Sequence, residues 1–151
     1  DNIRYGKADA SDEEVRRAAE TAQALEFIMQ MEGGFEAKVA QGGANLSGGQ
    51  KQRLSIARAL VRKPGIYVFD DSFSALDYKT DAKLRQALRQ ETGGAAVLIV
   101  AQRVSTVMNA DRIIVMENGR VVGDGTHAEL LQNNAVYREI VASQLSEEEI
   151  A

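Results

Sequence analysis

The residues best suited to chemistry lie in a short loop that runs directly into a helix. The loop has the sequence LSGGQ at residues 46–50, and apolar residues recur at helical spacing through residues 51–60. A hydroxyl, two glycines and an amide at this place leave backbone N–H groups exposed at the positive end of a helix dipole. The pattern therefore predicts a loop that binds phosphate.

A pair of carboxylates follows an apolar run further along the chain. Asp70 and Asp71 come directly after Ile66–Phe69, at the carboxyl end of a predicted strand, which is the edge where ligands bind in open α/β sheets. In a functional interpretation Asp70 binds magnesium, directly or through water, because a hard cation prefers carboxylate oxygen. Asp71 would then face an attacking water. In the alternative interpretation, the two acids only end a strand and cap a turn.

Two helices are predicted before these acids. Ser11 and Glu14 form a capping-box pattern, and apolar residues then keep one helix face to about Met31. The second helix covers Gly48–Arg62 and stops at Pro64, which cannot continue it. This second helix begins in the LSGGQ loop and would therefore fix its position.

The elements after the second helix predict a parallel sheet. Two continuous apolar runs, 66–69 and 95–101, flank a predicted helix at 78–90, and such runs are typical of parallel strands buried on both faces. The elements expected next are a short helix at 104–109, a strand at 112–116, a hairpin turn at 117–120 and a helical tail at 128–144. His127, the only histidine, follows Thr126 in a second capping-box pattern and is predicted to be a helix residue rather than a catalytic one.

Composition narrows the possible classes of protein. A chain of 151 residues has the size of one domain, and its 26% charged and 44% hydrophobic residues are normal for a folded one. The net charge of −4 argues against a nucleic-acid surface, and the lack of cysteine excludes disulfides and thiolate metal sites. The apolar runs are too short to span a bilayer, so we expect any membrane association through another segment or subunit.

The motifs resemble those of a known family. Residues 46–60 resemble, almost letter for letter, the signature motif of ATP-binding cassette (ABC) ATPases. The segment YVFDDSFSALD at 67–77 looks like the family's Walker B strand and D-loop, and residues 97–106 resemble its next strand and switch, or H-loop. The resemblance implies an α/β, P-loop NTPase-like fold with a mostly parallel sheet flanked by helices. It implies a helical subdomain at 1–47 and the C-terminal part of the RecA-like core at 48–151.

The resemblance also implies roles for individual residues. Asp70 matches the Walker B aspartate that holds Mg²⁺, Asp71 the catalytic carboxylate, and Gln102 the switch position. In the family two such domains dimerise head to tail, and each ATP lies between one domain's Walker motifs and the other's signature. The residues expected at the γ-phosphate of the partner's ATP are Ser47, Gly48, Gly49 and Gln50. Those expected in the D-loop at the dimer interface are Ser74, Ala75, Leu76 and Asp77.

Two departures from the family pattern fall on one predicted site. Where the family carries glutamate, Asp71 retracts the carboxylate by about 1.5 Å, one C–C bond, and a misplacement of about 1 Å can cost on the order of 100-fold in rate. Where the family carries histidine, Gln102 can donate an N–H but cannot become cationic or relay a proton. Together they predict slow hydrolysis at this chain's own site.

The loop that usually wraps the phosphates of a nucleotide is missing from the sequence. No GxxxxGK[ST] segment occurs in the 151 residues. Gly43 and Gly48 have the required glycine spacing, but Gly49 and Gln50 follow them in place of Lys and Ser or Thr. The resemblance also begins just after the family's Q-loop. We therefore expect this sequence to correspond to the C-terminal part of a nucleotide-binding domain. The isolated chain is expected to be inactive and to show no tight ATP binding in calorimetry.

These expectations lead to a functional hypothesis with alternatives. The resemblance implies an ABC-type ATPase subunit of an exporter, using ATP and Mg²⁺, with a second nucleotide-binding domain, presumed a heterodimer partner, and transmembrane domains as partners. Its place would be the cytoplasmic face of the membrane. The first alternative is an ATP-binding regulatory half with little hydrolysis of its own. The second is a chromosome-maintenance or DNA-repair ATPase head, disfavoured because neither coiled coils nor basic surfaces are evident in the sequence.

Overall fold

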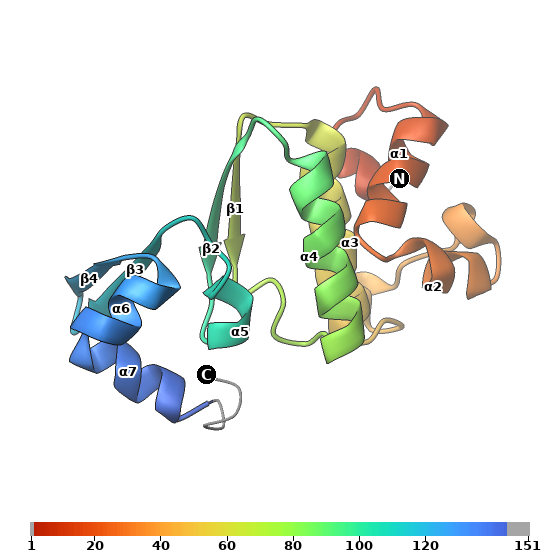
Figure 1. The fold of residues 1–151 in the computed structure, drawn as a ribbon. Helices are drawn as coiled ribbons and strands as arrows, with labels where there is room; N and C mark the ends of the chain where they lie inside the picture. Colours follow the sequence, from red (N-terminus) through yellow and green to blue (C-terminus); the bar gives the residue numbers. More distant parts are fainter. Residues whose placement is uncertain (1, 145–151) are drawn as a thin grey trace. The chain divides into compact units, whose positions relative to one another are not determined.

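The computed structural model describes residues 2–144, which fall into two compact units, Asp1–Val100 and Ala101–Ala151 (Figure 1). The first contains η1 (Ile3–Tyr5), α1 (Asp12–Thr21), α2 (Leu25–Gln30), η2 (Gly34–Glu36), η3 (Gln41–Gly43), α3 (Gly48–Arg62), β1 (Ile66–Asp70), α4 (Tyr78–Glu91) and β2 (Ala96–Val100). The second contains α5 (Val104–Val107), β3 (Ile113–Glu117), β4 (Arg120–Gly125), α6 (His127–Asn133) and α7 (Ala135–Ala142).

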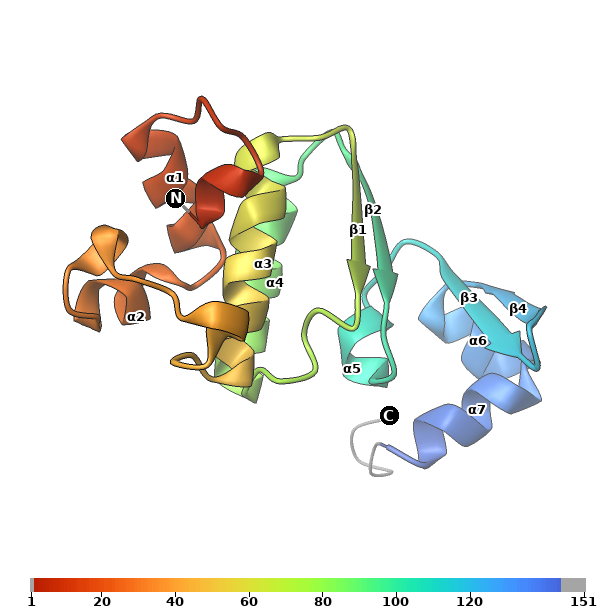
Figure 2. The same cartoon turned by 180° about the vertical axis from the view of Figure 1, so that it is seen from behind.

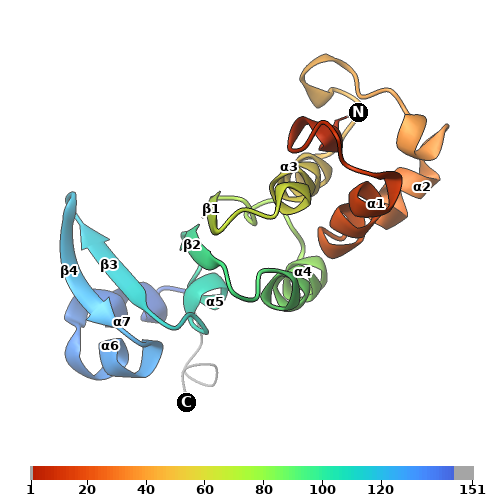
Figure 3. The same cartoon turned by 90° about the horizontal axis from the view of Figure 1, so that it is seen from above.

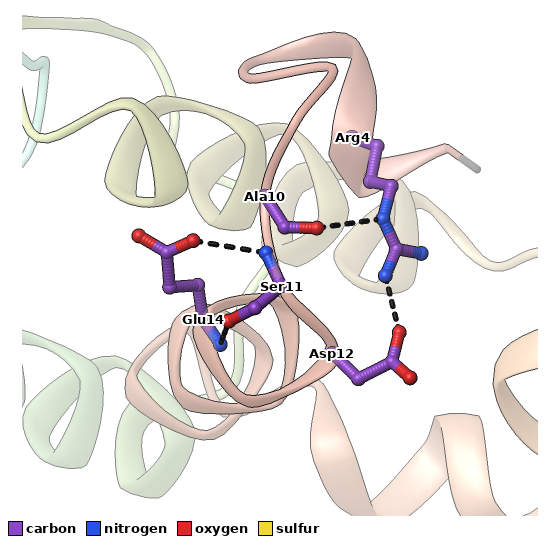
Figure 4. Close-up of polar contacts among 5 residues, drawn as sticks. All are labelled: Arg4, Ala10, Ser11, Asp12 and Glu14. Carbon is purple, nitrogen blue, oxygen red and sulfur yellow. Dashed lines mark hydrogen bonds and ion pairs between the residues drawn. The ribbon is translucent and has the colours of Figure 1, made fainter.

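The predicted capping box at the start of α1 is confirmed. The Ser11 hydroxyl accepts from the Glu14 N–H at 3.2 Å, and a Glu14 carboxylate oxygen accepts from the Ser11 N–H at 2.9 Å (Figure 4). Arg4 braces the same turn, because its Nε donates to the Ala10 carbonyl at 3.0 Å and its guanidinium pairs with Asp12. The other Glu14 oxygen accepts from Lys7 Nζ at 2.7 Å. The helix start is therefore fixed from both sides.

This turn predicts an acid-dependent loss of stability. The hydrogen bond from Lys7, followed by that from the Ser11 N–H, lowers the pKa of Glu14 from 4.5 to about 2. Since the pKa is lower in the folded state, Glu14 stabilises the fold above pH 4.5, and this contribution is lost as the pH falls from 4.5 towards 2. In thermal unfolding, we expect Glu14→Gln to melt below the wild type at pH 7 and the difference to vanish near pH 2. A gap that persists at pH 2, or equals that of the neighbouring Glu13→Gln, would contradict this.

The predicted continuous helix from residue 11 to about Met31 is wrong. The chain forms two helices, α1 and α2, because Gln23 adopts a left-handed conformation with φ 55°. The Gln23 N–H donates to the Glu20 carbonyl at 2.9 Å and the Ala24 N–H to the Ala19 carbonyl at 2.7 Å, which is a Schellman ending. Arg53 of α3 donates to the Gln23 carbonyl at 2.7 Å and so holds this corner from another helix.

The prediction for Gly48–Arg62 is confirmed as α3, the central helix of the first unit. Lys63, at φ 48°, ends the helix just before Pro64. Helix α1 packs along α3 and also contacts α4. The buried face of α3 consists of Leu54, Ile56, Ala57, Leu60 and Val61. The predicted domain boundary between residues 47 and 48 lies within the first unit, and that division stays a prediction.

Strands β1 and β2 form the predicted parallel pair, with Ile66 opposite Ala96 and Asp70 opposite Val100. Both faces were expected to be buried, but within residues 2–144 only one of them is. Tyr67 and Phe69 are 4% and 2% exposed, whereas Ile66 and Val68 are 67% and 62% exposed. The cause is that the helices of this unit lie on one side of the two strands, as Figure 3 shows from above. Tyr67 and Phe69 join the core that contains Leu84 and Leu88 of α4.

The second unit has its own antiparallel hairpin sheet. Strands β3 and β4 pair across a two-residue turn in which Asn118 and Gly119 have φ 49° and 75°, which confirms the predicted hairpin. Helices α6 and α7 follow β4 (Figure 2). The predicted single tail at 128–144 is broken at Asn134, whose side chain accepts from the Tyr137 N–H at 2.8 Å and caps α7.

His127 is the first residue of α6, as predicted, and Thr126 caps that helix through the expected box with Glu129. The Nδ1 atom of His127 lies 2.8 Å from the hydroxyl of Tyr137, and the two rings meet edge to face. Tyr137 is buried in the core of the second unit with Val104, Ile113, Val115 and Leu130. The histidine therefore braces α6 against α7.

Candidate functional site

The LSGGQ loop forms a capped helix start. The Ser47 hydroxyl accepts from the Gln50 N–H at 3.2 Å, and Gln50 Oε1 accepts from the Ser47 N–H at 2.9 Å. The Lys51 N–H donates to the Ser47 carbonyl at 3.0 Å. Within residues 2–144, the N–H groups of Gly48 and Gly49 have no protein acceptor. They lie in the first turn of a 15-residue helix, where the dipole favours an anion.

The loop that follows β1, residues 71–77, packs against this helix start. A side chain at Gly49 would place its Cβ 2.8 Å from the Ala75 carbonyl oxygen, and one at Gly48 would lie 3.4 Å from the Ala75 Cβ. Real Cβ atoms essentially never approach backbone oxygen as closely as 2.8 Å. The structure thus brings together the two predicted segments, and their contact requires glycine at position 49.

The two predicted acids occupy the carboxyl end of β1. Asp70 is the last residue of the strand and Asp71 the first of the loop, and both are exposed. Asp71 has φ 47°, in the left-handed region, where non-glycine residues are uncommon. Its N–H donates to the Val100 carbonyl at 3.0 Å, and its Oδ2 accepts from the Ser74 hydroxyl at 3.0 Å. The loop therefore turns the Asp71 carboxylate towards its own residue Ser74.

The four residues predicted as a D-loop differ in their local roles. Ser74 and Ala75 are exposed, while the side chain of Leu76 is buried in the core. Asp77 is the N-cap of α4, since its carboxylate accepts from the Thr80 N–H at 3.0 Å. Hydrogen bonds with Thr80 lower the pKa of Asp77. Two of the four residues therefore also anchor the loop at its end.

Two polar residues of α3 for which the sequence predicted no role lie near this helix start, and one of them, Gln52, connects it to loop 71–77. The side-chain amide of Gln52 contacts three residues of loop 71–77, and Arg53 donates from Nε to the Gly49 carbonyl at 3.3 Å. The Arg53 guanidinium also lies 4.8 Å from the centre of the Phe27 ring. Burial lowers the pKa of Arg53. Helical spacing could have indicated Gln52, because it lies three residues after Gly49 and so on the same side of the helix.

Gln102 belongs to the second unit, in the segment between β2 and α5. Its side chain is exposed, and its carbonyl accepts from Gln144 Nε2 at 2.8 Å. Gln144 Oε1 accepts in turn from the Val104 N–H at 2.9 Å. Gln102, Arg103, Ser105 and Gln144 line an open depression. Gln144 thus holds the backbone of the predicted switch residue.

Comparisons with known proteins agree with these motifs. A family model described as "ABC transporter" matches residues 3–74, which contain both the LSGGQ loop and the acidic pair. An uncharacterized ABC transporter ATP-binding protein of Mycobacterium tuberculosis is 49% identical over 147 residues, 95% of this chain and 25% of that protein. The chain belongs to the ABC transporter ATP-binding family. A human relative of this ABC domain is named mitochondrial potassium channel ATP-binding subunit and is 46% identical over 95% of the chain and 20% of its own length.

The ABC fold is also shown by a solved structure. A bacterial Atm1-family ABC exporter with ATP bound matches 97% of this chain with a TM-score of 0.93 and 38% identity. The chain spans about a quarter of that protein and of the mycobacterial relative. The described helices of this ABC domain include none with the length and apolar character needed to cross a membrane.

The acids of the ABC domain fit a magnesium ion that a nucleotide helps to hold. Within residues 2–144, no group of three or more His, Cys, Asp or Glu side chains is placed to form a metal cage. Mg²⁺ in nucleotide sites is usually held by one or two carboxylates together with phosphates and water. Asp70 and Asp71, exposed at the carboxyl end of β1, can supply such carboxylates.

Proposed function

We propose that this chain is part of the ATP-binding subunit of an ABC exporter, and that residues 46–50 contact an ATP carried by another nucleotide-binding domain. The observation that carries the proposal is the capped start of α3, where the Gly48 and Gly49 N–H groups are left without protein acceptors in the described chain.

The acidic pair and Gln102 would serve a second, slower site. Asp70 would hold Mg²⁺, which when bound neutralises phosphate charge. Asp71 would orient the attacking water, and Gln102 would donate an amide N–H to the γ-phosphate. The Asp71 carboxylate has a shorter reach than the family's glutamate, and it already accepts a hydrogen bond from Ser74. Both features support slow hydrolysis there.

The proposed assembly has two nucleotide-binding domains and transmembrane domains, at the cytoplasmic face of a membrane. The solved neighbour is an ABC exporter with ATP bound, which supports export as the use of the ATP. A heterodimer fits the sequence best, because the signature is intact whereas Asp71 and Gln102 depart from the family pattern. Export would then be driven mainly by the site that this chain's signature completes.

A second candidate is an ATP-binding regulatory half that hardly hydrolyses ATP. Asp71 and Gln102 favour it, because together they weaken both water activation and proton relay. The human relative also supports it, because that protein is named an ATP-binding subunit of a channel and not an exporter. The two candidates differ in turnover, since only the first requires sustained hydrolysis by the assembled protein.

The proposed role of Ser47 is tested by Ser47→Ala in the full-length protein assembled with its partner. A hydrogen bond from a hydroxyl to a charged phosphate contributes about 1.5–3 kcal/mol, so we expect ATP hydrolysis to fall by about 10- to 100-fold. Loss of the helix cap alone costs about 1 kcal/mol of stability. Ser11→Ala is the matched control, because it removes the same capping box from α1. If both variants lower hydrolysis equally, or neither does, the proposed contact is wrong.

A further inference from the structure

The side chain of Gln52 bridges α3 and loop 71–77. Its Nε2 donates to the Asp71 carbonyl at 3.0 Å and to the Ser74 hydroxyl at 3.0 Å. Its Oε1 accepts from the Ala75 N–H at 3.0 Å. One amide therefore uses both of its donor hydrogens and its acceptor on a single loop.

These bonds act on a stretch of backbone that lacks regular structure. Loop 71–77 begins with the left-handed Asp71 and ends with the Asp77 cap, and its internal backbone bond runs from the Leu76 N–H to the Phe73 carbonyl at 3.2 Å. Gln52 joins the beginning of the loop, beside the acidic pair, to Ala75 near its end. The three hydrogen bonds of this amide therefore hold the loop, which lacks the regular backbone hydrogen bonds of a strand or helix.

Ala75, whose N–H donates to Gln52, also contacts the LSGGQ loop. Gly49 lies one turn before Gln52, and the space for a Cβ at Gly49 is filled by the Ala75 carbonyl. The peptide on each side of Ala75 is thus fixed to α3, the N–H by Gln52 and the carbonyl by the close approach of Gly49. A shift of loop 71–77 would have to be accompanied by a shift of the helix start.

We propose that Gln52 is a positioning residue that fixes loop 71–77 to the start of α3, so that Asp71 and the LSGGQ glycines keep one relative geometry. The consequence for catalysis rests on the proposed function. If Asp71 serves this chain's ATP and Gly48 and Gly49 serve the partner's, Gln52 mechanically links the two nucleotide sites. Removing the Gln52 side chain would therefore change both nucleotide sites, although neither nucleotide needs to contact it.

The test uses two substitutions and a control in the assembled full-length protein. Gln52→Met keeps the length of the side chain and removes all three hydrogen bonds. Gln52→Glu keeps an acceptor for the Ala75 N–H but removes both donors. The control is Ser55→Ala, an exposed position one turn further along α3. Hydrogen–deuterium exchange is measured at residues 71–77, together with kcat and KM for ATP hydrolysis.

We expect the Ala75 amide to exchange at least about 10-fold faster in Gln52→Met and at the wild-type rate in Gln52→Glu and Ser55→Ala. We expect kcat to fall about 10-fold in both Gln52 variants, with KM within about 2-fold of the wild type, because geometry rather than nucleotide contact is lost. Exchange in the core of α3 should stay unchanged.

Wild-type exchange at Ala75 in Gln52→Met would overturn the positioning role, whatever the ATPase rate. Faster exchange with unchanged kcat, in an assembly where Ser47→Ala does lower hydrolysis, would overturn the link to catalysis. Faster exchange in an assembly where Ser47→Ala has no effect would support the positioning role and contradict the proposed function. The two proposals can therefore fail separately.

Discussion

Replacing Gly49 by alanine should lower ATP hydrolysis by the assembled protein by about 100-fold or more. The new methyl group would lie 2.8 Å from the Ala75 carbonyl oxygen, and neither partner is a flexible side chain that could move aside. Overpacking of this kind costs about 1–3 kcal/mol, and relief requires loop 71–77 to move away from α3. A displacement of about 1 Å in catalytic geometry can cost on the order of 100-fold in rate.

The matched control for this variant is Gly65→Ala. No atom lies within 4 Å of a Cβ built at Gly65, and its φ is outside the left-handed region. Steady-state ATPase assays of both variants, with thermal unfolding to confirm folding, check the prediction. An ATPase rate of Gly49→Ala within about 2-fold of Gly65→Ala would show that the approach to Ala75 is irrelevant to turnover.

The largest gain is expected from restoring the family residues at both altered positions. Asp71→Glu extends the carboxylate by about 1.5 Å, and Gln102→His restores a side chain that can relay a proton. We expect the double variant to raise hydrolysis at this chain's own site by about 100-fold. Each single variant should give much less, since either remaining defect would still limit the reaction.

This gain is measured in an assembly whose other site is slowed about 10- to 100-fold by Ser47→Ala in this chain, so that an increase in turnover reports the restored site. Adding Asp70→Asn should remove the gain, because a neutral amide is a poorer ligand for Mg²⁺ than a carboxylate. Unchanged turnover in the double variant, or a gain that survives Asp70→Asn, would mean that Asp71 and Gln102 do not limit hydrolysis at this site.

Local patterns in the sequence predicted the helix starts well. The predicted capping boxes at Ser11 and Thr126 both form, and Gly48–Arg62 is helical over its whole predicted length, with a further box at Ser47 that was not predicted. Such boxes depend on residues three positions apart, so the sequence contains all the information they need. The ending of α1 was missed because Gln23, rather than a glycine, takes the left-handed position there.

The sequence predicted less well which strand faces are buried and which distant segments are in contact. The apolar run of β1 predicted burial on both faces, yet Val68 is exposed, because burial depends on which elements cover each face and not on the strand's own residues. The sequence also predicted residues 46–50 and 70–77 as candidate sites without their contact. That contact depends on the tertiary approach of Gly49 to Ala75 and on the amide of Gln52. Helical spacing places Gln52 on the side of Gly49, but no local pattern specifies that loop 71–77 lies there.

The central claim, that residues 46–50 act on an ATP held by another polypeptide, is tested most directly by vanadate trapping with a photoreactive ATP analogue. The label marks the polypeptide that holds the nucleotide, so it separates the two sites in one assembly. With Ser47→Ala in this chain, we predict that trapped label on the partner falls by about 10-fold or more while label on this chain's polypeptide is unchanged. Loss of label from this chain's polypeptide, with the partner's label intact, would contradict the account.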